Sequence, residues 1–221
     1  MTQILQVHEK NPEKRHIKTA AKFIENGKII LVPTDTGYCF VGDSTLDSSH
    51  LTFLTLRPSH PQNKPFSLIC KDISQASRIA QISSQVFRVL SRLWPGPYTL
   101  ILPAHKNTSK IIGGPKRKTV GLRISAHNIL SSLIEECENP LLITSVTDED
   151  ELVASEYFES ENQGDSWWTN IAEICEKYSS KSLALALECN EIVPLRVSTI
   201  IDYSEDVPVI LRDGGWPIDF I

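Results

Sequence analysis

Four cationic side chains stand where basic residues commonly bind anions, beside prolines or near the ends of expected strands. Arg57 and Lys64 lie seven residues apart, and each is followed by a proline. Arg123 and Arg212 lie at or near the ends of two apolar segments that we expect to form strands. An arginine at such a place seldom lacks an anionic partner, because an unpaired buried charge is costly. The partner is either a ligand phosphate or a carboxylate of the chain itself.

Short hydroxyl side chains stand at the ends of three further expected strands. The sequence Pro33-Thr34-Asp35-Thr36-Gly37-Tyr38 follows a buried apolar run, and α/β folds bind ligands where loops leave the sheet. Thr144-Ser145 ends another expected strand, and Ser198-Thr199 begins a third. Turn capping by Asp35 and the β propensity of threonine explain the same residues without a ligand. Both interpretations stay open at this point.

Sequence signatures of the common nucleotide and metal sites are missing. Residues 113–119 end in Lys-Thr, but their glycine spacing is wrong for a P-loop, and neither GxGxxG nor GxSxG occurs. The five cysteines and six histidines are scattered, without the spacing of metal ligands. We therefore expect free buried thiols and no metal ion held by protein side chains. Any nucleotide would be bound by separate Arg, Lys and Ser residues.

The length and composition predict one compact domain. The chain has 221 residues, 41% of them hydrophobic and 22% charged, which are ordinary values for a globular protein. The 22 basic and 27 acidic residues give a net charge of -5, which argues against a generally basic coat for nucleic acid but not against a local basic cleft. No apolar run approaches the roughly 20 residues of a membrane helix, and no signal peptide is visible. We expect a cytoplasmic protein without membrane association.

Apolar patterning predicts helices and strands that alternate irregularly, which is typical of an α/β domain with a mixed, twisted sheet. Helices are expected at 17–26, 48–56, from 73 onward, around 86–93, and at 127–137 and 167–178. Strands are expected at 28–32, 38–41, 67–70, 98–102, 120–124, 141–146, 183–187, 197–201 and 207–211. We interpret residues 1–221 as one domain with a core from about 14 to 215. The polar stretch 148–166 is expected to be a surface excursion.

Seven segments carry most of the polar residues described above, in a fixed order along the chain. They are KIILVPTDTGYCFVG (28–42), RPSHPQNKPFSLI (57–69), LWPGPYTLIL (93–102), VGLRI (120–124), ITSV (143–146), STIID (198–202) and ILRDG (210–214). Together they resemble the YrdC-like domain family, the threonylcarbamoyl-AMP synthases and their relatives. The basic run 116–119 and the long loop 57–64 are most similar to the YciO-type branch of that family.

The resemblance implies a fold and a reaction. The implied fold is a twisted, open mixed sheet with flanking helices around a concave, positively lined cavity. The implied enzyme is a nucleotidyltransferase that joins L-threonine, bicarbonate and ATP, with Mg²⁺ on the nucleotide, into threonylcarbamoyl-adenylate and pyrophosphate. A separate transferase then uses the adenylate to modify adenosine 37 of tRNA. Attack of a carbamate on the α-phosphorus needs positioning and charge neutralisation more than acid–base groups.

The resemblance also implies roles for individual residues. The positions that match ATP- and phosphate-binding residues are Arg57, Lys64, Thr144, Ser145 and Arg212. The positions that match the threonine side are Thr34, Thr36, Tyr38, Arg123 and Ser198. No position is implied as a catalytic acid or base.

Three positions depart from the synthases, and the first is Val197, which stands where they carry a proline. Thr55 stands where they carry a lysine, and Thr147 where they carry an asparagine. A lost charge-assisted contact is worth roughly 1.5–3 kcal/mol, so two losses at one site predict a weakened synthase.

Two other functions fit the same residues. The first is a non-catalytic protein that binds a nucleotide, tRNA or double-stranded RNA through the positive cavity. Lys106, Lys110 and the run 116–118 would extend such a surface, or they form an ordinary solvated loop. The second is an enzyme that activates a different amine or carboxylate with ATP.

Overall fold

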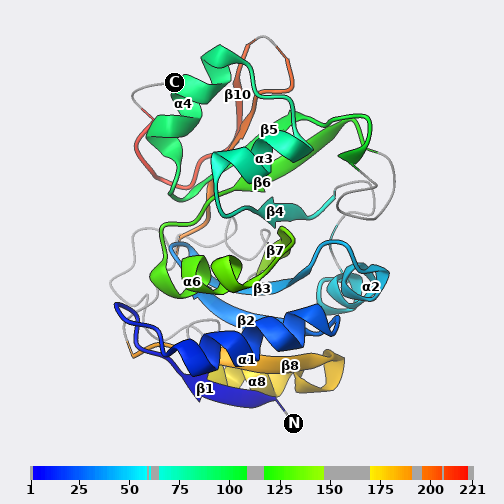
Figure 1. Cartoon of the computed structure of the whole chain (residues 1–221), viewed down its shortest axis with the longest axis vertical. Helices are drawn as coiled ribbons and strands as arrows, with labels where there is room; N and C mark the ends of the chain where they lie inside the picture. Colours follow the sequence, from blue (N-terminus) through cyan, green and yellow to red (C-terminus); the bar gives the residue numbers. More distant parts are fainter. Residues whose placement is uncertain are drawn as a thin grey trace.

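The computed structural model describes residues 2–58, 60, 65–108, 117–146, 170–190, 196–205 and 207–218. Within these ranges ten strands form one mixed sheet in the order β1-β8-β2-β3-β7-β4-β6-β5-β9-β10. Figure 1 shows that the sheet twists strongly along the length of the molecule and that helices pack against it. This arrangement confirms the expected α/β domain with a mixed, twisted sheet.

The elements follow the sequence predictions closely. The strands are β1 (Gln3–Gln6), β2 (Ile29–Thr34), β3 (Gly37–Asp43), β4 (Ser67–Ile69), β5 (Tyr98–Pro103), β6 (Thr119–Arg123), β7 (Leu141–Ser145), β8 (Leu183–Glu188), β9 (Thr199–Asp202) and β10 (Val209–Arg212). The helices are α1 (Lys14–Glu25), α2 (Asp47–Leu56), α3 (Ile73–Ile79), α4 (Ser84–Leu93), α6 (Asn128–Glu136) and α8 (Ile171–Tyr178), followed by the short 3₁₀ turn η4 (Ser179–Lys181). The expected excursion 148–166 lies outside the described residues. None of the helices in the described ranges is both long and apolar enough to cross a membrane.

Helix α1 shows how local signals set an element. Ile17, Ala20, Ala21 and Ile24 recur at helical spacing and are all buried, which forms the apolar stripe expected of a helix that covers a sheet. Gly27 adopts a positive φ of 70° just beyond the helix, a conformation that glycine reaches without steric cost. Its N–H donates to the carbonyl oxygen of Ile24 at 2.9 Å, so the helix ends where the glycine predicts.

Strand β1 is an element that the sequence analysis missed. The segment Gln-Ile-Leu-Gln pairs in parallel with β8 at one edge of the sheet, with Gln3 opposite Leu185. Only two of its four residues are apolar, and three of the four are exposed. Its pairing therefore comes from β8, which lies far away in sequence, and not from a pattern within the segment.

The register of the central strands separates an apolar face from a polar face. Leu68, Leu122, Leu100 and Ile201 lie opposite one another on β4, β6, β5 and β9, and all four are completely buried. They define the apolar face. Helix α3 overlaps β5 and β6 in the view of Figure 1, and the carbonyl of its last residue, Ile79, accepts from the His105 amide just after β5 at 3.0 Å.

The polar face carries the side chains next in sequence to those leucines, because neighbouring residues of a strand point in opposite directions. Ser67, Gly121, Thr99 and Arg123 belong to it. Ser67 and Gly121 are partly exposed. A β-carbon on Gly121 would approach the Ser67 hydroxyl oxygen to 2.9 Å, so small side chains meet on this face.

Candidate functional site

The turn between β2 and β3 places two buried threonines beside a carboxylate. The Oγ1 atom of Thr34 accepts a hydrogen bond from the Thr36 amide at 3.0 Å and donates one to the Gly37 carbonyl at 2.7 Å. The two threonine hydroxyls lie 3.1 Å apart. Tyr38 pairs with Pro33, next to Thr34 in the strand, and so points to the other face. The structure therefore brings Thr34 and Thr36 together and directs Tyr38 away from them.

Arg123 is anchored to this turn. Its side chain is 5% exposed, and its Nη2 atom lies 2.5 Å from Oδ1 of Asp35. Its Nη1 atom donates to the Thr36 hydroxyl at 2.8 Å, and its Nε atom donates to the Gly96 carbonyl at 3.2 Å. Of the two partners that the sequence allows for Arg123, a ligand phosphate or an internal carboxylate, the structure supplies the carboxylate.

Asp35 is the functional residue that the sequence analysis missed. Its motif leaves ligand binding and turn capping both open, and the predicted site residues do not include it. In the structure its carboxylate also accepts from the Ser125 hydroxyl at 2.5 Å and from the Ala126 amide at 3.3 Å. It thereby ties the β2–β3 turn to the end of β6 and to the start of α6. The signal that points to it is the nearly buried Arg123, since a buried guanidinium requires a counter-ion and Asp35 is the acid of the adjacent motif.

A second cluster forms where β9 begins and β10 ends. Arg212 donates from Nε to the Ser198 carbonyl at 3.0 Å and from Nη2 to the Ser198 hydroxyl at 2.9 Å. The Ser198 hydroxyl also lies 3.0 Å from the Thr99 hydroxyl on β5. The two predicted site residues Arg212 and Ser198 are therefore in direct contact.

A β-bulge in β10 is responsible for the direction of Arg212. Ile210 pairs with Ile201, but Arg212 pairs with Ile200 instead of Thr199, so β10 holds one extra residue here. In a regular ladder Arg212 would lie opposite Thr199 and point to the apolar face. The bulge turns it to the polar face, where Ser198 lies, which is a common use of bulges near functional sites.

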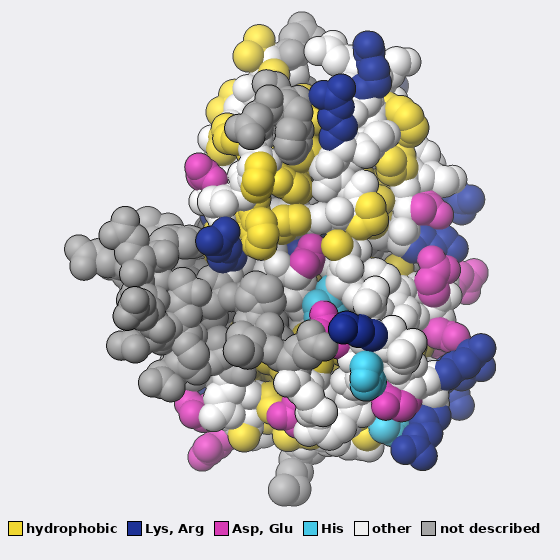
Figure 2. Space-filling view, turned by 90° about the vertical axis from the view of Figure 1, so that its left-hand side faces the viewer, with side chains coloured by type: hydrophobic (Ala, Val, Ile, Leu, Met, Phe, Trp, Pro, Cys, Tyr) yellow, Lys and Arg dark blue, Asp and Glu magenta, His cyan; other side chains and the backbone are white. Residues whose placement is uncertain are grey.

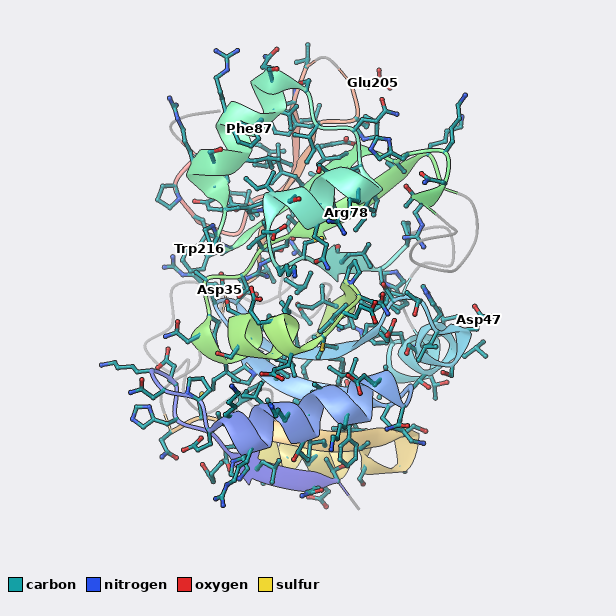
Figure 3. All side chains as sticks on the ribbon, viewed as in Figure 1. Asp35, Asp47, Arg78, Phe87, Glu205 and Trp216 are labelled. Carbon is teal, nitrogen blue, oxygen red and sulfur yellow. The ribbon has the colours of Figure 1, made fainter. Side chains whose placement is uncertain are left out.

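The two clusters lie at the same end of the sheet, because both contact the turn before β5. Gly96, whose carbonyl binds Arg123, donates its own amide to the Ile124 carbonyl at 2.8 Å. The next residue, Pro97, accepts from the Thr199 amide at 3.0 Å. In Figure 3, Asp35 and Trp216 lie on the same side of the molecule, and the indole N–H of Trp216 donates to the Val197 carbonyl at 2.8 Å.

Arg57 reaches the site from the end of α2. It is 7% exposed, and its Nη1 atom donates to the Ser145 carbonyl at the end of β7. Ser145 lies opposite Cys39 in the β3–β7 ladder, and the Cys39 sulfur is 3.7 Å from the Thr34 hydroxyl. Thr144 precedes Ser145 and points to the opposite face. The predicted phosphate residues Arg57 and Ser145 are therefore adjacent, whereas the Thr144 side chain points away.

Three further positions named in the sequence analysis are Lys64, Thr147 and Thr55, and the structure describes only Thr55. Lys64 and Thr147 lie outside the described residues, as do Lys110 and Lys116. Thr55 is exposed on α2, and its hydroxyl donates to the Leu51 carbonyl one turn earlier at 3.1 Å. That hydroxyl is engaged within its own helix.

The site is suited to binding and orientation more than to nucleophilic or metal chemistry. The five cysteines are free and buried. Burial raises the pKa of Cys70 and of Cys137 to about 12, so neither forms the reactive thiolate at neutral pH. No three His, Cys, Asp or Glu side chains of the described ranges gather as a metal site would require. The side chains that gather are guanidinium and hydroxyl groups, which recognise anionic and polar ligands.

The ten-stranded mixed sheet and its flanking helices define an α/β domain with a polar cluster at one end of the sheet. The chain belongs to the Sua5/YciO/YrdC family, whose model, described as telomere recombination, matches residues 22–214. This membership confirms the resemblance drawn from the seven sequence segments.

Relatives from two branches match nearly the whole chain. The uncharacterized protein YciO of Escherichia coli is 29% identical over 214 residues, which cover 97% of this chain and 96% of YciO. The threonylcarbamoyl-AMP synthase of Pyrococcus abyssi is 30% identical over 222 residues, which cover 100% of this chain and 60% of the synthase.

Solved structures show the same two branches. The crystal structure of E. coli YciO has a TM-score of 0.79 at 27% identity and covers 97% of this chain and 96% of that one. P. abyssi Sua5 in complex with L-threonine has a TM-score of 0.79 at 28% identity and covers 99% of this chain and 59% of that one.

Proposed function

We propose that this protein condenses L-threonine, bicarbonate and ATP into threonylcarbamoyl-AMP and releases pyrophosphate. The observation that carries the proposal is the gathering of Arg123, Thr36, Ser198 and Arg212 around one end of the polar face. The 30% identity to a threonylcarbamoyl-AMP synthase over the whole chain supports it. The similarity to a Sua5 structure that contains L-threonine supports a threonine side at this site.

In this proposal the chain contributes position and charge. Arg57 and Arg212, with Lys64, would neutralise the triphosphate, and the hydroxyls of Thr36 and Ser198 would orient threonine. Bicarbonate loses water to give carbon dioxide, and the threonine amine adds to it and releases a proton to form a carbamate. A carbamate oxygen then attacks the α-phosphorus, and pyrophosphate leaves with the bonding electrons. Arg123 acts as a positioning residue, because it holds Thr36 and Asp35 in place. Mg²⁺ would arrive on the phosphate oxygens of ATP, as is usual where a protein offers few carboxylates.

A direct assay tests the proposal. The purified protein is incubated with ATP, Mg²⁺, bicarbonate and labelled threonine, and both pyrophosphate and the adenylate are measured. We expect both products, with pyrophosphate release that depends on threonine. Arg57→Ala and Arg212→Ala should each reduce the rate and weaken ATP binding more than they destabilise the fold. Arg78→Ala, an exposed arginine on α3, is the matched control.

Binding without turnover is a second candidate, and one observation favours it. Thr55 is exposed and engages its own helix, so it does not replace the lysine that the synthases carry at this position. ATP or double-stranded RNA that binds without any adenylate formation would support this function and contradict the first. This protein would then not supply the adenylate that is used to modify adenosine 37 of tRNA.

A further inference from the structure

The last strand of the sheet presents an apolar edge. Val209, Ile210 and Leu211 of β10 are 54%, 43% and 56% exposed, and Val207 just before the strand is 73% exposed. Within the described ranges β10 pairs with β9 alone, and residues 207–211 carry no charge. Soluble proteins usually protect an edge strand with charged side chains, because its unpaired backbone groups recruit another strand. Residues 207–211 lack such charges, and the edge of β10 is limited instead by its short length, by Pro208 and by the bulge before Arg212.

The opposite edge of the same sheet is built differently. Strand β1 begins and ends with glutamine, and the Gln6 amide donates to the carboxylate of Glu188 on the neighbouring β8. Its most exposed apolar residue, Ile4, is 40% exposed. Of the two edges of the sheet, the one formed by β10 therefore carries more exposed apolar side chains.

The exposed side chains lie on both faces of β10. Val209 pairs with Asp202 and Ile210 with Ile201, and these neighbours on β9 point in opposite directions. A partner that packs against one face of the sheet would cover the exposed side chains of that face alone. A strand that extends the sheet beside β10 would cover exposed side chains on both faces. Figure 2 shows hydrophobic side chains gathered in the upper half of the molecule, the level at which α4 and β10 lie in Figure 1.

We propose that two copies of this chain associate through β10, with the two strands antiparallel about a twofold axis at Ile210. In this register each Val209 lies opposite the partner's Leu211, so the apolar edge is complementary to itself, as a twofold interface requires. In this register Arg212 would lie opposite the partner's Pro208, which has no N–H to donate, so the pairing is confined to residues 209–211.

The exposed surface sets the strength of this dimer. Val209, Ile210 and Leu211 are each about half exposed, so pairing of these three residues in two copies buries less than the ~1,000 Å² of a specific, stable interface. The dimer is therefore weak and reversible, and it forms only at high protein concentration.

Sedimentation velocity from about 1 to about 200 µM protein tests this association. We expect the sedimentation coefficient to rise from the monomer value towards the dimer value across that range. Val209→Lys should weaken the dimer by at least about 30-fold, because it places two charges in the paired edge. Leu51→Lys is the matched control: Leu51 is 66% exposed on α2, far from β10, and its replacement should leave association unchanged.

Amide hydrogen exchange of the unaltered chain gives a readout that does not depend on a variant. Among residues 209–211, the amides that point away from β9 should exchange more slowly at high than at low protein concentration. A chain that stays monomeric at the highest concentration overturns the proposal. So does a dimer that persists in Val209→Lys, or one that leaves β10 unprotected.

Discussion

Replacing Asp35 by asparagine tests how the site is constructed. Asp35 is the counter-ion of a buried arginine: it accepts from Nη2 of Arg123 at 2.5 Å and from the Ser125 hydroxyl at 2.5 Å. Its second oxygen accepts from the Ala126 amide at 3.3 Å. Asparagine has nearly the same shape but no charge. Arg123 would therefore keep a hydrogen-bond acceptor and lose its counter-ion.

The expected magnitude follows from the burial of the pair. Removal of one partner of a buried ion pair usually costs about 3–5 kcal/mol, because the other charge is left uncompensated. The Asp35 side chain is 16% exposed, so solvent screens part of this cost, and asparagine retains one acceptor. We expect the free energy of unfolding to fall by about 2–4 kcal/mol. Glu205→Gln, at an exposed acid outside the network, should change it by about 0.5 kcal/mol or less.

Urea denaturation followed by circular dichroism measures these differences. Arg123→Met in the Asp35→Asn background removes the unpaired charge, so the double variant should be at least about 1.5 kcal/mol more stable than the sum of the single losses predicts. An Asp35→Asn variant within about 0.5 kcal/mol of the unaltered protein, or a strictly additive double variant, would refute the assignment of Asp35 as counter-ion.

Three other changes have defined outcomes. Gly214→Ala should lower the Tm, because a β-carbon there would lie 2.3 Å from the Val197 carbonyl oxygen and 2.9 Å from the Thr199 amide nitrogen; an unchanged Tm contradicts this contact. Thiol titration of the denatured, non-reduced protein should count five groups, whereas a count of one or three would reveal disulfides. Thr55→Lys with Thr147→Asn should raise adenylate formation at least ~10-fold, equivalent to ~1.4 kcal/mol, and no gain in rate would contradict the importance of these two departures.

Most elements could be predicted because their causes are local. Gly27 ends α1 through its own backbone conformation, and Asp72 caps α3 by accepting from the Gln75 amide at 2.6 Å. The apolar run 28–32 leads into β2 (Ile29–Thr34), and every residue of that strand is buried. Strand β1 was not predicted, because its pairing with β8 depends on residues far away in sequence.

The arrangement of the site depends on register, which local patterns do not contain. Thr144 and Ser145 match a family motif together, but neighbouring residues of a strand cannot both face one ligand. The opposite directions of these two side chains follow from the sequence once the strand is predicted. The bulge that directs Arg212 towards Ser198 could not be predicted, because it is defined by the pairing of β10 with β9. The pairing of Arg123 with Asp35 likewise joins residues 88 positions apart.

The two threonine hydroxyls of the β2–β3 turn differ in what they can still offer a ligand. A hydroxyl has one donor hydrogen and two acceptor sites. Thr34 donates to the Gly37 carbonyl and accepts from the Thr36 amide, so its contact with the Thr36 hydroxyl must fill its second acceptor site. Thr36 then donates to Thr34 and accepts from Arg123, which leaves one acceptor site. In the proposed reaction Thr34 therefore holds the turn, and Thr36 is placed to accept a hydrogen bond from the amine or hydroxyl group of the substrate.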